Sequence, residues 1–105
     1  MSKVNIYQGQ VPDSATALVT ATKTQTIDAA VVCNTSASSV TLQVWIVIDG
    51  GSTGDDHKIY DALSVDADSE TSLALLINHA IPAGAKLFAQ ASAATSLTLT
   101  ISGRE

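Results

Sequence analysis

The sequence predicts an all-β fold, a single antiparallel β-sandwich of jelly-roll or immunoglobulin-like type with about eight short strands. Two observations carry this prediction. Apolar and polar residues alternate with period two from Ser39 to Ile48 and again from Ser96 to Ser102, which is typical of half-buried strands. Turn-forming residues separate these segments at short intervals. The 105 residues suffice for one domain, and we expect it to span residues 1–105.

Weaker strand patterns fill the rest of the chain, at about residues 3–7, 16–21, 26–33, 58–65 and 85–91. In the 26–33 segment, the pattern predicts one buried face, made of Ile27, Ala29, Val31 and Cys33. In the 58–65 segment Asp61 lies in phase with the apolar residues, which weakens the pattern there.

Residues 73–81 fit two patterns. Leu73, Leu76 and Ile77 match a helical stripe, whereas Leu73, Leu75 and Ile77 match a strand. We favour the strand, because Asn78 and the proline at position 82 would cut a helix short.

Four polar or glycine-containing segments are predicted turns, at residues 11–14, 34–38, 49–56 and 81–84. The 49–56 segment is the longest, and Asp49, Asp55 and Asp56 surround its glycines. Oxygen ligands on a flexible loop can hold calcium. The spacing matches neither an EF-hand nor a calcium-binding β-roll, so an ordinary hairpin loop is favoured over a calcium site.

Charge is scarce. Charged residues make up 14% of the chain, against about a quarter in typical proteins. The net charge is −5 and the five basic residues are scattered, which argues against direct nucleic-acid binding. A surface so poor in charge suits contact with other protein chains, and the alternative is a monomer with a threonine-rich β surface.

The chemistry-bearing residues form no recognisable site. His57 and His79 lack the spacing of a zinc site, and no nucleophile elbow, P-loop or dinucleotide motif occurs. Cys33 lies in an apolar run and is expected to be a buried, inert thiol. We therefore expect a protein that is not an enzyme and needs no cofactor or metal.

No apolar stretch approaches the 18 or so residues of a membrane-spanning helix, and no membrane partner is expected. The first residues lack the apolar core of a signal peptide, so we expect a protein made in the cytoplasm and used without processing.

Trp45 points away from the main apolar face of its strand, and three interpretations stay open: a second buried layer, a subunit interface or a ligand platform. Three further apolar residues are placed similarly and complete the interface hypothesis: Val47, Leu76 and Phe88. A sugar-binding module would require Trp45 to be accessible.

Residues 1–12 could form an arm that is exchanged with a neighbouring subunit, because Val4, Ile6 and Tyr7 have few apolar neighbours in the sequence. An ordinary edge strand is the alternative.

Several stretches resemble small virion structural proteins of tailed bacteriophages, of the capsid decoration or tail-associated type. A strand that ends in an Asn-Thr-Ser turn precedes an alternating strand in residues 30–42, and residues 59–65, 81–87 and 90–103 match in outline. The resemblance implies a β-sandwich subunit located in the virion and made in the host cytoplasm. Its partners would be further copies of itself and other virion proteins, above all the major capsid protein. Either a capsid decoration protein or a tail, neck or fibre-base component would fit, and neither has catalytic residues to transfer.

Overall fold

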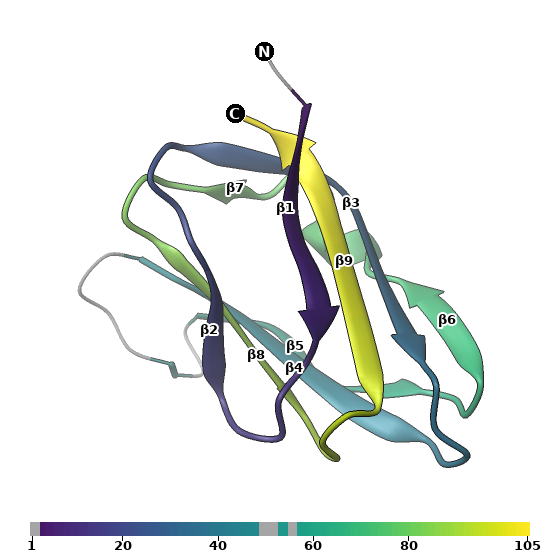
Figure 1. The fold of residues 1–105 in the computed structure, drawn as a ribbon. Helices are drawn as coiled ribbons and strands as arrows, with labels where there is room; N and C mark the ends of the chain where they lie inside the picture. The colour runs from purple at the N-terminus through teal and green to yellow at the C-terminus, as the bar shows by residue number, and fades with distance from the viewer. Residues whose placement is uncertain (1–2, 49–52, 55–56) are drawn as a thin grey trace.

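The chain folds into two antiparallel β-sheets that pack face to face, as the computed structural model shows for residues 3–48, 53–54 and 57–105 (Figure 1). The first sheet, sheet A, has the order β1 (Lys3–Gln10), β9 (Leu97–Arg104), β3 (Gln25–Asn34), β6 (Ser69–Ser72), and β7 (Ala80–Ile81) also pairs with β3. The second sheet, sheet B, has the order β2 (Thr16–Thr20), β8 (Lys86–Ala91), β4 (Val40–Val47), β5 (Lys58–Val65). The predicted fold class, an all-β sandwich, is confirmed.

The core lies between the sheets and is built from alternate residues of each strand. Leu97, Leu99 and Ile101 of β9 are fully buried, as the period-two pattern predicts. Val40, Leu42 and Val44 of β4 face them from sheet B. Because each strand alternates between core and surface, the two sheets need only one continuous apolar layer.

The predicted buried face of β3 is wrong beyond Ile27. The register between β3 and β9 shifts between Ile27 and Ala29, so one extra residue enters β3. After this bulge Ala30 and Val32 point into the core, while Val31 is 41% exposed. A one-residue insertion moves every later side chain to the opposite face, which places Cys33 half-buried on the outer surface and not in the core.

The end of β4 also departs from the expected alternation. Trp45 and Val47 are buried outside the main core cluster, Ile46 is half-buried and Ile48 is 59% exposed. The neighbouring strand β5 carries register shifts opposite this segment, and its pairing is irregular there.

These shifts also explain why the Asp61 side chain is exposed, although the sequence places it in phase with the apolar residues of this strand. The carboxylate of Asp61 is exposed and forms an ion pair with the Lys58 ammonium at 3.1 Å. The next residue, Ala62, has a left-handed backbone with φ 59°. The extra residues in β5 therefore let Asp61 avoid the core that a regular alternation would force upon it.

The predicted strand at residues 73–77 is wrong, because the chain forms a short 3₁₀ helix, η2 (Ala74–Leu76). Leu73 and Leu76, three residues apart, lie on the same side of this turn and are fully buried. Leu75 is 60% exposed. Asn78 then adopts a left-handed backbone (φ 71°) and donates its N–H to the Ile27 carbonyl at 2.7 Å, which ends the turn as the sequence had indicated.

Asn34 organises the predicted turn at residues 34–38. Its side chain is fully buried, and its Nδ2 donates to the carbonyls of Ser38 at 2.8 Å and Val65 at 3.0 Å. Its Oδ1 accepts from the N–H and the hydroxyl of Ser36, at 2.9 and 2.8 Å. One amide thus links the β3–β4 turn to the end of β5 across the two sheets.

Candidate interaction surfaces

The residues proposed from sequence as an interface fall into three different environments. Leu76 belongs to the core and is 0% exposed, so it has no surface to offer a partner in the folded chain. Trp45 and Val47 are 6% and 2% exposed. Phe88 is half-buried, and it alone of these four retains substantial exposure.

Trp45 occupies the outer side of sheet B within a cross-strand row. It pairs with Phe88 of β8 on one side and with Lys58 of β5 on the other, and Phe88 in turn pairs with Ala17 of β2. The Lys58 ammonium lies 5.3 Å from the centre of the indole ring, within the range of a cation–π contact. This covered position matches the interpretation as a second buried layer, and it leaves no accessible indole face for a sugar.

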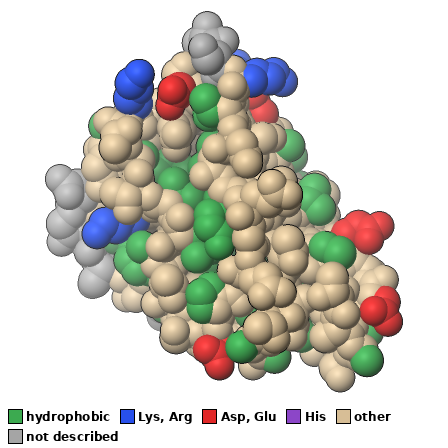
Figure 2. All heavy atoms as spheres, viewed as in Figure 1, with side chains coloured by type: hydrophobic (Ala, Val, Ile, Leu, Met, Phe, Trp, Pro, Cys, Tyr) green, Lys and Arg blue, Asp and Glu red, His purple; other side chains and the backbone are tan. Residues whose placement is uncertain are grey.

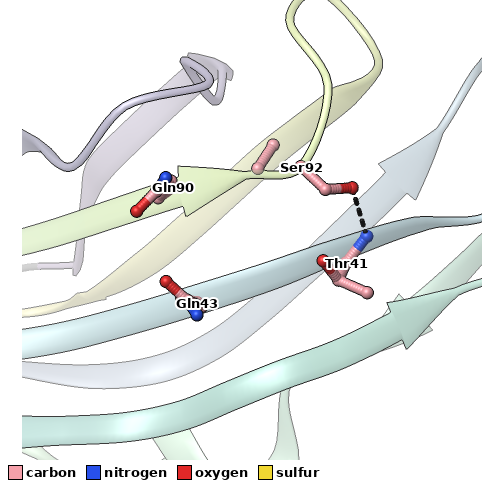
Figure 3. A pocket seen from close by; sticks show the side chains of 5 residues that line it. Thr41, Gln43, Gln90 and Ser92 are labelled. Atoms are coloured by element: carbon pink, nitrogen blue, oxygen red, sulfur yellow. Dashed lines mark hydrogen bonds between the residues drawn. The ribbon is translucent and has the colours of Figure 1, made fainter. Parts of the chain in front are cut away.

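A shallow hollow adjoins this row. Its volume is about 120 Å³, and it is lined by Thr41, Gln43, Gln90, Ala91 and Ser92. Gln43 and Gln90 are cross-strand neighbours whose amides lie side by side on β4 and β8 (Figure 3). The Ser92 hydroxyl accepts a hydrogen bond from the Thr41 N–H at 3.0 Å. Sequence patterning did not identify this hollow, because it arises only when β4 and β8 pair.

The outer face of sheet A carries few charges in its middle. Cross-strand pairing aligns Gln8, Thr100, Val31 and Ser72 in one row across four strands. A second row joins Gln10, Thr98, Cys33 and Glu70, and Glu70 is the only charged residue in either. Figure 2 shows this face, with charged side chains at its upper end and margins and none over the middle of the strip formed by β1, β9 and β3. At the upper end Lys3 is exposed, and Arg104 of β9 forms an ion pair with Asp28 of β3 at 3.0 Å.

The three N-terminal residues proposed as interface residues, Val4, Ile6 and Tyr7, lie on an edge strand. Residues 3–10 pair with β9, which matches the edge-strand alternative within this chain. Val4 is half-buried, and Ile6 and Tyr7 pack against the core. Exchange of this segment between subunits stays a prediction.

An apolar strip runs along the open side of the sandwich. Strands β1 and β2 are the edge strands of sheets A and B, and they lie next to each other on this side. Leu18 of β2 is half-buried here and packs against the core, as Ile6 and Tyr7 of β1 do. Hydrophobic side chains are visible in the strip between β2 and β1 (Figure 2).

Among the residues that the structure describes, no group of three or more His, Cys, Asp or Glu side chains is arranged to hold a metal ion. The possible calcium loop at Asp49–Asp56 lies outside the described residues apart from Thr53 and Gly54. Within the described ranges no helix is long and apolar enough to cross a membrane.

No protein-family model and no curated protein matches the sequence. Among solved structures, the fold is similar to a chain of the structure of infectious bursal disease virus Gx strain, with a TM-score of 0.54 and 16% sequence identity. The match covers 96% of this chain but 31% of that chain, so the present chain spans about a third of its length. What this comparison shows is the fold, an antiparallel β-sandwich that also occurs within a chain of a virus structure.

Proposed function

We propose that this chain is a non-enzymatic structural subunit of a bacteriophage virion, and specifically a capsid decoration protein that stabilises the shell. It would bind copies of itself and the major capsid protein through its surface. A tail, neck or fibre-base component is the alternative within the same class.

The outer face of sheet A is the observation that carries the proposal. Two cross-strand rows, each spanning four strands, expose Gln, Thr, Ser, Val and Cys side chains and a single carboxylate. Partner contact buries such a face at low cost, because there are few charges to desolvate. Small side chains also lose little rotamer freedom on contact.

Two further observations support a virion role. The sandwich is similar in fold to part of a chain from a virus structure. Sequence stretches in both halves of the chain also resemble small phage virion proteins.

The first test is the copy number of this chain in purified virions of the phage that encodes it, measured by mass spectrometry against the major capsid protein. A copy number close to that of the capsid protein is the expected result. A number many times lower would refute the decoration role in favour of the tail, neck or fibre base. Absence from virions would overturn the structural role altogether.

A second test addresses the surface. We expect Thr100→Lys, in the centre of the sheet A face, to reduce incorporation into virions, because it places a charge in the buried contact. Thr22→Lys adds the same charge at an exposed position outside the strands and serves as the matched control. Equal incorporation of the two variants would remove sheet A as the contact face.

A further inference from the structure

Among the described residues five strands lie at the edges of the two sheets, and they differ in how well they could accept another strand. Strand β7 has only two residues. Strand β6 has four residues and contains Glu70. Strand β5 is irregular, with two register shifts, and β2 has five residues and a shift of its own. Strand β1 has eight residues and no charge from Val4 to Gln10. Strand β1 also has a register shift, between Asn5 and Tyr7, but its regular run from Tyr7 to Gln10 is the longest one on these edges that carries no charge.

The hydrogen-bonding direction along β1 can be derived from its ladder with β9. The Val11 N–H donates to the Leu97 carbonyl at 2.9 Å, so the backbone of Val11 faces β9. In an antiparallel ladder this direction alternates, and the register runs without a shift from Tyr7 to Gln10. The N–H and C=O of Gln8 therefore point away from β9, toward the open edge.

Two charged residues flank this strand at equal distances from Gln8 along the sequence, one at the start of β1 and one in the bend that follows it. Lys3 lies five positions before Gln8 and Asp13 lies five positions after it. Both side chains are exposed, and neither forms an ion pair with another described residue. If two copies of β1 pair antiparallel with Gln8 opposite Gln8, each Lys3 comes to the same end as Asp13 of the second copy. A parallel arrangement would bring the two lysines together.

We propose that β1 is a self-association edge, at which a second copy of this chain pairs antiparallel about a twofold axis through Gln8. The bulge between Asn5 and Tyr7 limits the regular ladder to the central residues, and the Lys3–Asp13 pairs hold the two ends. The two A sheets then form one continuous sheet, and their sparsely charged outer faces join into a single larger surface. The apolar strip between β1 and β2 lies next to the contact.

This inference deepens the subunit role proposed above by naming a self-contact, but its test needs no virions. The mass of the purified full chain is measured by light scattering or sedimentation over a range of concentrations. We expect a concentration-dependent species of twice the 10.8 kDa chain mass. A chain that stays monomeric up to about 1 mM would overturn the inference, while its presence in virions would leave the proposed function standing.

Gln8→Pro tests the backbone contact. Proline is tolerated on an edge where the N–H faces solvent, so the monomer should fold. The variant removes one outward donor from each copy, and we expect the dimer dissociation constant to rise about tenfold or more. Gln8→Ala keeps the N–H and is the matched control, with dimerisation retained. Circular dichroism confirms folding of both, and equal dimerisation by the two folded variants would refute pairing at β1.

A charge exchange tests the register independently of any proline effect. Lys3→Glu places two acidic groups at each end of the pair, and we expect the dissociation constant to rise about tenfold at low salt. Combining Lys3→Glu with Asp13→Lys should restore the wild-type value. Lys86→Glu, at an exposed position on β8, changes the net charge equally and should have a smaller effect. Failure of the double variant to recover would exclude this register.

Discussion

Gly103 is the position where one added carbon should disturb the fold most clearly. It lies in the middle strand of sheet A, opposite Val4 of β1 and Ile27 of β3. A Cβ at this position would be 1.9 Å from the Thr26 carbonyl oxygen and 2.8 Å from the Ile6 Cδ1. The Ile6 side chain can rotate, but the Thr26 carbonyl belongs to the backbone of β3. Gly103→Ala therefore requires β3 and β9 to separate.

The cost follows from that separation. An ordinary van der Waals contact begins at 3.4 Å, so the strands must part by about 1.5 Å at this point. We expect a loss of about 3 kcal/mol in the free energy of unfolding, at the upper end of typical overpacking penalties. Alanine is also preferred over glycine in a strand by about 0.5–1 kcal/mol, which offsets part of the strain. The expected loss in the free energy of unfolding already includes this offset. For a domain of this size the melting temperature should fall by about 15 °C.

The measurement is urea and thermal unfolding of wild type, Gly103→Ala and Gly9→Ala. Gly9 is the matched control in the neighbouring strand, because its added Cβ would meet only the end of the Tyr7 side chain, at 2.8 Å from the hydroxyl oxygen. That ring can turn away, at the loss of its exposed hydrogen bond to Gln10, so we expect a cost below about 1 kcal/mol. Equal stability of the two variants would refute the close approach of β3 and β9 at Gly103.

Three further predictions concern the core and the covered tryptophan. Asn34→Ala should lower the unfolding free energy by about 2–4 kcal/mol in urea titration, because it leaves the Val65 carbonyl and other buried turn groups without their partner; a loss under about 0.5 kcal/mol would contradict the network. Val32→Thr should cost about 1–3 kcal/mol and Val31→Thr less than about 0.5, because only Val32 is buried; the reverse order would contradict the bulge in β3. Trp45 fluorescence should be blue-shifted and resist acrylamide quenching in the native state, because the ring is 6% exposed; quenching as efficient as that of the unfolded chain would contradict its burial.

Much of the sandwich could be predicted from local pattern. The alternation of Leu97, Leu99 and Ile101 with serine and threonine identified β9 and its buried face, since a strand exposes every second residue to each side. The turn at residues 34–38 was also predictable from its polar residues. Where the pattern failed, a bulge or a short helical turn had changed its phase: Val31 and Val32 exchange faces after the bulge in β3, and Leu73 and Leu76 meet across a 3₁₀ turn.

The candidate interaction surfaces were harder to predict from the sequence than the fold was. For an apolar residue out of phase, such as Trp45, the sequence left a second buried layer, a subunit interface and a ligand platform open, and the interface hypothesis also included Leu76. Both side chains are covered by the chain itself. The sparsely charged face of sheet A is different, because its threonine and serine positions in β9 were visible as the polar half of the alternation. Their alignment with Val31 and Gln8 depends on which strands are neighbours, and the sequence does not contain that information locally.

The sequence by itself determined the fold class, the main core residues of β4 and β9, and a surface poor in charge, because each depends on side-chain type and spacing along one segment. Only the tertiary structure decided the phase of β3 and β5, the burial of Trp45 and the position of β1 at an open edge. These depend on strand register and neighbour order, which are chosen by the packing of the whole core. A bulge costs little locally, and the chain accepts it wherever it turns the apolar residues of the following segment inward.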